Sequence, residues 1–153
     1  MKKISFALVI ILSVTGSVFA QTKEPVPVDP AESAAIEKTA TDYAGGFFTG
    51  DSARVASAVH PELAKRIITK DDKGNAMIQN MGASGLVYAA MKSKKNDPNP
   101  SEPFKATVTI YDVFNGIATV KIVTNKFDFI DYAQLAKIKG HWKIINVLWA
   151  FTH

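Results

Sequence analysis

Apolar positions in the first third of the chain recur at helical spacing. Asp29-Pro30 is typical of a helix start, because an aspartate can cap the first free amides and a proline fits the first turn. Gly50 is expected to end this helix. The apolar positions that fall on one of its faces are Ile36, Ala40, Tyr43, Ala44 and Phe47.

Two more helices are predicted before residue 93. Asp51 can cap a short second helix, which His60-Pro61 would end. A short strand or extended segment over 64–69 and a turn at 71–74 follow. A third helix is then predicted over about 75–92. Its apolar side would carry Met77, Met81, Gly85, Tyr88 and Met91.

The apolar period changes from helical to two after residue 103, which is typical of strands. The first strand would carry Phe104, Ala106, Val108 and Ile110 on one face. Asn115-Gly116 indicates a tight hairpin, with further strands over about 117–124, 127–138 and 141–151. Helices that precede a meander of strands predict an α+β domain over 30–153, with three N-terminal helices packed in a curved antiparallel sheet.

The last predicted strand is apolar on both faces. Alternation places Trp142 and Ile144 with Leu148 and Ala150 on one face; Ile145, Val147, Trp149 and Phe151 lie on the other. A sheet with one solvated face should alternate apolar with polar residues. We therefore expect a homodimer through the sheet; the alternative is that the N-terminal segment of the chain covers the second face.

Residues 1–20 have the three parts of a signal peptide. Lys2 and Lys3 are followed by an apolar stretch over 6–14, and Val18-Phe19-Ala20 offers small residues for cleavage before Gln21. The alternative is an uncleaved membrane anchor, for which the apolar stretch is short. We expect a periplasmic or secreted protein, with no membrane span after cleavage and a proline-rich linker over 21–29.

Composition excludes several classes of site. The chain has no cysteine, so no disulfide framework and no lipid-anchored cysteine is possible. The net charge of +4 is modest, and its one basic cluster, at residues 92–95, is too short for a nucleic-acid partner. His60, His141 and His153 are scattered, which gives no metal site, and no phosphate-binding glycine loop or other cofactor motif occurs.

Three stretches together resemble a known family. They are residues 43–54 (from Tyr-Ala-Gly-Gly-Phe-Phe-Thr-Gly-Asp to Arg), 58–66 (Ala-Val-His-Pro-Glu-Leu-Ala-Lys-Arg) and 135–149 (Leu-Ala-Lys-Ile-Lys-Gly-His-Trp-Lys-Ile-Ile-Asn-Val-Leu-Trp). In this order and spacing the chain resembles the putative lumazine-binding family of the nuclear transport factor 2-like superfamily, over about residues 31–151. The resemblance implies a cone of three helices in a curved sheet with a cavity between them, but no catalytic motif.

Asp112 and His60 are the candidate catalytic residues. If the first sheet strand continues in register, Asp112 follows Ile110 on the apolar face, where desolvation would raise its proton affinity as a general base requires. The alternative is that Asp112 is solvated at the strand end, because bulges re-aim such residues. His60 could act as an acid, a base or a ligand, or could bond a free carbonyl at the helix end.

A second group of candidates could bind a flat ring. Tyr43, Phe47, Met81, Tyr88 and Trp142 would line the cavity, although such stripes are also typical of plain core. Asn146 could orient the ligand or tie the last strand to a helix. Gly45-Gly46 indicates either close helix packing or space for a ligand. Asp128 and Asp131 are expected to face water.

The sequence therefore leaves three functions open. The first is an exported domain that binds a small aromatic ligand. The second is a cofactor-independent isomerase or dehydratase with Asp112 as base, and the third is a protein-interaction module whose cavity is filled by its own side chains.

Overall fold

The computed structural model describes residues 28–93, 99 and 101–152. The predicted signal peptide and residues 21–27 of the predicted linker lie outside this range. No helix among the described residues is long and apolar enough to cross a membrane.

The first two helices form as their capping residues predict. In α1 (Pro30–Thr49), the Asp29 side chain accepts a hydrogen bond from the Ala31 amide at 2.9 Å, and Gly50 ends the helix in the left-handed conformation at φ 74°. The Asp51 side chain caps α2 (Ser52–Ala58) through the Arg54 amide at 2.9 Å. The predicted apolar face of α1 is buried except for Phe47, which is half-buried.

The predicted third helix is wrong over its first half. A long hairpin of β1 (Val59–Lys70) and β2 (Ala76–Gly82) follows α2, and α3 (Ala83–Ser93) begins only after it. Six of the seven β2 side chains are exposed, so the strand has no buried face to produce alternation. Pairing with β1, from Lys70↔Ala76 to Ala64↔Gly82, sets its conformation. The three helices therefore do not all precede the sheet.

The remaining strands follow the predicted hairpins. They are β3 (Ala106–Phe114), β4 (Ile117–Thr124), β5 (Phe129–Ile138) and β6 (His141–Phe151). Asn115-Gly116 and Lys139-Gly140 make the tight turns, with φ positive at all four residues. The sheet order is β2-β1-β6-β5-β4-β3, and β1 runs parallel to β6. The sheet is therefore mixed rather than purely antiparallel.

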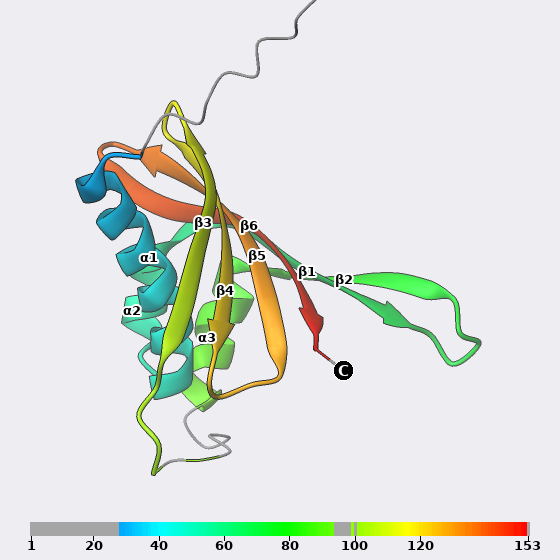
Figure 1. Cartoon of the computed structure of the whole chain (residues 1–153). Coiled ribbons are helices and arrows are strands. Elements are labelled where there is room, and N and C mark those ends of the chain that lie inside the picture. The colour runs from blue at the N-terminus through cyan, green and yellow to red at the C-terminus, as the bar shows by residue number, and fades with distance from the viewer. Residues whose placement is uncertain (1–27, 94–98, 100, 153) are drawn as a thin grey trace, which may run out of the picture.

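The helices lie together on one side of the curved sheet (Figure 1). We call the side that faces them the inner face and the opposite side the outer face. The core lies between the helices and the inner face, and it includes Ile36, Val55, Leu86, Val120, Leu135 and Ile144. The β1–β2 hairpin extends away from the helices, beyond the rest of the sheet (Figure 1).

Two bulges move side chains between the faces. In β3, Ile110 pairs with Val120 and Asp112 with Thr119, so Tyr111 is the extra residue. In β6, Ile144 pairs with Leu135 and Asn146 with Gln134, so Ile145 is extra. The expected alternation of β6 therefore breaks at Ile145. Beyond it the inner-face residues are Val147 and Trp149, whereas Leu148 and Ala150 move to the outer face.

Candidate functional site

A cavity of about 240 Å³ lies between the helices and the inner face. Side chains from α1, α3 and five strands reach it, and most of them are apolar. The lining residues are Tyr43, Ala44, Phe47, Lys65, Met81, Leu86, Thr124, Phe129, Asp131 and Trp149. A concave, mainly apolar pocket with a few converging polar groups is the usual form of a small-molecule site.

The polar groups in this cavity form one closed network, which we call the buried triad: Tyr43, Lys65 and Asp131. Lys65 Nζ donates to Asp131 Oδ1 and to the Tyr43 hydroxyl, each at 2.6 Å. The Tyr43 hydroxyl donates to Asp131 Oδ2 at 2.9 Å. The triad joins side chains from α1, β1 and β5, which are far apart in the sequence. It therefore forms only when the chain is folded.

Burial governs the protonation of the triad. Asp131 is 3 % exposed and Lys65 9 %. Burial lowers the pKa of Lys65, and the Asp131 carboxylate offsets this only in part. Burial, followed by the adjacent carboxylate, raises the pKa of Tyr43 well above its usual 10.0. Tyr43 is therefore held as a neutral phenol and hydrogen-bond donor at physiological pH.

Aromatic rings surround the Lys65 ammonium group. Its Nζ lies 5.0 Å from the centre of the Trp149 ring, 5.4 Å from Tyr43 and 5.6 Å from Phe129. Rings at these distances attract a cation through their electron-rich faces. Two of the three Nζ hydrogens go to Asp131 and Tyr43, so one donor remains for a ligand.

The prediction that Asp131 faces water is wrong, and Lys65 did not appear among the candidates. A signal for both was present in the sequence. Lys65 stands between Leu63 and Ile67 in β1, and Asp131 between Phe129 and Ala133 in β5, at the inward positions of alternating strands. One basic and one acidic residue at such positions on two strands indicate a buried pair.

Three of the six residues predicted to bind a ligand line the cavity: Tyr43, Phe47 and Met81. Tyr88 is 55 % exposed on α3, with Lys92 Nζ 4.3 Å from the centre of its ring. Trp142 is buried near the start of α1, where its indole N–H donates to Glu32 at 2.8 Å. Asn146 lies on the outer face, bonded to Arg66 and Gln134.

Of the two positions considered for Asp112, the structure has the solvated one, and the inward position on the apolar face is wrong. The Tyr111 bulge turns the Asp112 side chain to the outer face, where it is exposed opposite Thr119. His60 lies near the start of β1, outside the cavity lining, and its Nδ1 accepts a hydrogen bond from the Glu62 amide at 3.2 Å. A catalytic role for either residue stays a prediction, and neither side chain reaches the buried triad.

The glycine pair of α1 allows close packing. A Cβ at Gly46 would lie 3.0 Å from the Val55 amide nitrogen and from the Asp51 carbonyl oxygen, at the start of α2. A Cβ at Gly45 would lie 3.0 Å from the Arg54 guanidinium. Of the two readings of Gly45-Gly46, the structure supports close helix packing.

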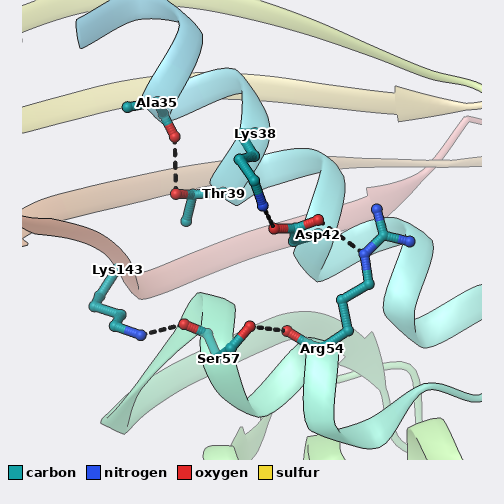
Figure 2. A network of polar contacts seen from close by, with 7 residues as sticks. All are labelled: Ala35, Lys38, Thr39, Asp42, Arg54, Ser57 and Lys143. Atoms are coloured by element: carbon teal, nitrogen blue, oxygen red, sulfur yellow. Dashed lines mark hydrogen bonds and ion pairs between the residues drawn. The ribbon is translucent and has the colours of Figure 1, made fainter.

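A second, more polar groove lies outside the cone, where α1 and α2 meet the start of β6. Asp42 accepts hydrogen bonds from Lys38 and from Arg54 Nε, the latter at 2.8 Å, and Lys143 donates to the Ser57 carbonyl (Figure 2). We call Lys38, Asp42 and Arg54 the surface network. Burial works against ionisation of Asp42, but the bonds from Lys38 and Arg54 outweigh it and lower the pKa of that carboxyl.

The chemistry available in the cone follows from these contacts. The buried triad offers a hydrogen-bond donor, a carboxylate and an amine in contact with one another inside an apolar enclosure. Clusters of perturbed titratable groups in a cavity are typical of functional sites. Among the described residues, no group of three or more histidine, cysteine, aspartate or glutamate side chains is placed to hold a metal ion.

Comparison with known families and structures agrees with this fold. Residues 31–150 match the family described as "Putative lumazine-binding". Comparison with the curated proteins finds no match.

The solved structures that are similar share the architecture. A nuclear transport factor 2-like protein from Shewanella baltica is 22% identical, with a TM-score of 0.64, over 82% of this chain and 97% of that one. A protein of the same fold from Methylobacillus flagellatus is 18% identical (TM-score 0.63; 83% and 97% covered). A ketosteroid isomerase-like protein from Erwinia carotovora atroseptica is 14% identical (TM-score 0.56; 82% and 99%). At these identities the likeness establishes the fold.

Proposed function

The chain belongs to the family described as "Putative lumazine-binding", and we propose that it binds a small, flat, uncharged ligand in the cavity of the cone. The observation that carries the proposal is the buried triad, which places a free hydrogen-bond donor within an otherwise apolar cavity. The family description points to the same class of ligand, because lumazine is a flat bicyclic dione.

The size of the cavity limits the ligand. At about 240 Å³ it is smaller than the roughly 300–1,000 Å³ of pockets that hold drug-sized molecules. One ring or two fused rings suit this space. The Trp149 and Phe129 rings, 5.3 Å apart at their centres, offer apolar surface to such a ligand.

The charge of the triad limits the polar groups of the ligand. Lys65 and Asp131 neutralise each other. An anionic ligand would therefore be repelled by the carboxylate, and a cationic ligand would be repelled by the ammonium group. A neutral carbonyl oxygen avoids both penalties and accepts the remaining N–H of Lys65. We therefore expect a ring compound that carries a carbonyl group.

The first test is a native mass spectrum of the protein purified from its own host, followed by a fluorescence titration of the ligand-free protein with lumazine. A reproducible small-molecule adduct, or saturable binding of lumazine, supports the proposal. If the protein carries no adduct and binds neither lumazine nor smaller cyclic carbonyl compounds, the proposal fails.

A matched pair of variants locates the binding. Met81 lines the cavity, whereas Met77 lies four residues earlier on the same face of β2 and outside the cavity lining. Both are partly exposed, at 39 % and 43 %. Met81→Trp fills part of the cavity and should weaken binding at least about tenfold, or about 1.4 kcal/mol. Met77→Trp should leave the affinity unchanged; equal losses would place the ligand elsewhere.

We also propose that two copies associate through the outer face. Apolar side chains from four strands are exposed there: Ile68, Tyr111, Tyr132 and Leu148, with exposures from 43 % to 62 %. A second copy would cover this surface. Leu148→Lys should convert a dimer to a monomer in light scattering, whereas Thr107→Lys, near the edge of the same face, should not. A wild-type monomer at all concentrations would refute this.

Export is the remaining part of the proposal. It rests on the sequence pattern of residues 1–20, which predicts cleavage before Gln21. N-terminal sequencing of the protein expressed in full tests it. A mature N-terminus at Gln21 in the periplasm or medium is expected, and retention of Met1 in the cytoplasm would contradict it.

A cofactor-independent isomerase is the second candidate, favoured by one observation. Asp131 is a buried carboxylate at the cavity wall, with an amine and a phenol in contact with it, as proton transfer next to a carbonyl requires. Exchange of solvent deuterium into a small cyclic ketone, followed by NMR, tests this function. Deuterium exchange that is catalysed by the wild type and abolished by Asp131→Asn supports an enzyme. Exchange at the uncatalysed background rate excludes isomerase activity on that ketone.

A further inference from the structure

We propose that Lys65 forms a covalent imine with aldehydes or ketones that enter the cavity. The inference rests on the proposed function, since the carbonyl compound must first bind in the cone. It adds a chemical step in which the Lys65 amine, rather than only donating a hydrogen bond, bonds to the carbonyl carbon of the ligand.

The position of Lys65 distinguishes it from other lysines. Its side chain lines the cavity and is 10 % exposed, whereas that of Lys38 is 75 % exposed. Lys126 is also buried, at 4 %, but its Nζ donates to the backbone carbonyls of Asn99 and Glu102, and it does not line the cavity. Lys65 is thus a buried lysine whose amine faces a space that a ligand can occupy.

Imine formation needs a neutral amine, and the surroundings of Lys65 favour one. Apolar burial lowers the pKa of Lys65, although Asp131 opposes the shift. Asp131 Oδ1, 2.6 Å from Nζ, can accept the proton that the ammonium group must lose. The amine then attacks the carbonyl carbon. A C–N bond forms, the C=O π pair moves to the oxygen, and a proton passes from the attacking nitrogen to that oxygen, which becomes a hydroxyl.

The second half of the reaction expels water. Protonated Asp131 returns its proton to the new hydroxyl, either directly or through the Tyr43 hydroxyl, which lies 2.9 Å from Asp131 Oδ2 and 2.6 Å from Nζ. The hydroxyl leaves as water while the nitrogen lone pair forms the C=N bond. Overall, an ammonium group and a carbonyl compound give a protonated imine and one water molecule, with no oxidant or reductant. The product keeps a positive charge at Nζ, so its pairing with the Asp131 carboxylate is preserved.

The test uses the full chain with benzaldehyde and sodium cyanoborohydride, which reduces an imine to a stable benzyl amine. Intact mass and peptide mapping locate the label. We expect one benzyl group per chain at Lys65, at least about tenfold above the label on Lys38 or Lys126, since binding holds the reactants together. A label spread evenly over exposed lysines, or absent from the Lys65 peptide, would overturn the proposal.

Two variants and a non-reactive analogue separate the possible failures. Lys65→Arg should abolish the single label, while Lys126→Arg should retain it. A label that persists at full stoichiometry in Lys65→Arg contradicts the proposal; if Lys65→Arg does not fold, the wild-type peptide map decides alone. Benzyl alcohol, which lacks the carbonyl, measures binding separately. Binding of benzyl alcohol or lumazine without label at Lys65 rejects the imine and leaves the proposed function intact.

Discussion

The buried triad and the surface network use the same side-chain chemistry in two environments. In each, one aspartate joins a lysine to a second donor: Asp131 joins Lys65 to Tyr43, and Asp42 joins Lys38 to Arg54. The Lys65 side chain is 10 % exposed, whereas that of Lys38 is 75 % exposed. The donor–acceptor distances to the aspartate are similar in the two networks, from 2.5 to 2.9 Å. Burial is the largest difference between them; the second donor also differs, because Tyr43 is a phenol that bonds directly to Lys65, whereas Arg54 is a guanidinium.

Burial determines what each network can do. Water can replace Lys38 as a partner of Asp42, so that pair contributes little to stability and holds no ligand in place. No water is expected to compensate an unpaired Asp131 or Lys65 in an apolar cavity, so the triad is costly to break and able to recognise a ligand. The predictions below test this difference, from the largest effect to the smallest.

Removing one charge should separate the networks most clearly. Asp131→Leu leaves the Lys65 ammonium group buried and unpaired, and should lower the free energy of unfolding by about 3–5 kcal/mol in urea titrations. Asp42→Leu should cost about 1 kcal/mol. The double variant Lys65→Met/Asp131→Leu should recover most of the loss; failure to recover would show that shape, not charge, holds the triad together.

Removing the second donor of each aspartate gives a smaller contrast. Tyr43→Phe deletes the hydroxyl that donates to Asp131 at 2.9 Å, and should cost about 1.5–3 kcal/mol, the usual contribution of a buried bond to a charged group. Arg54→Met in the surface network should cost about 1 kcal/mol or less. Thermal unfolding of the two variants beside wild type measures both. Equal losses would remove burial as the explanation.

The two networks should also respond to opposite ends of the pH scale. The pKa of Tyr43 is raised in the folded state, so its contribution to stability is present below pH 10.0 and is lost as pH rises further. The pKa of Asp42 is lowered, so its contribution is present above pH 3.8 and is lost as pH falls. Unfolding free energies of wild type, Tyr43→Phe and Asp42→Asn across pH test both signs. A gap between wild type and Tyr43→Phe that widens above pH 10.0 contradicts the first.

Salt should give the smallest effect. The Lys38–Asp42 coupling, expected at about 0.3–0.5 kcal/mol for exposed helix pairs four residues apart, should approach zero in 1 M NaCl, where the Debye length is about 3 Å. The Lys65–Asp131 coupling should change little, because ions do not enter the cavity. Double-mutant cycles at low and high salt measure both couplings. A salt-sensitive Lys65–Asp131 pair would indicate that the cavity is open to electrolyte.

Local signals in the sequence predicted much of this fold. Asp29, Gly50 and Asp51 mark helix ends through hydrogen bonds with their near neighbours, and Asn115-Gly116 makes a hairpin through its own backbone preferences. Strand β2 was missed because pairing with β1, rather than a pattern within its own residues, sets its conformation. At β2, the pairing with β1 therefore overrode the helical pattern of the local sequence.

The site was harder to predict because one extra residue in a strand changes which of the following side chains face the cavity. One extra residue, Tyr111, moves Asp112 out of the cone, and another, Ile145, places Asn146 on the outer face. Tyr43 and Phe47 were found because they lie on the regular apolar face of α1, whereas Met81 reaches the cavity from β2 although the sequence pattern placed it on a helix. Lys65 and Asp131 could have been found by asking which charged residues occupy inward positions of strands.

The hairpin of β1 and β2 has a practical consequence for work with this protein. β2 pairs with β1 on one side, and on the other it ends the sheet (Figure 1). Its seven residues include no charge and no proline, the features that usually prevent an edge strand from recruiting another. Concentrated samples should therefore be monitored for slow fibril growth by thioflavin fluorescence, and Asn80→Lys is the substitution most suited to preventing it.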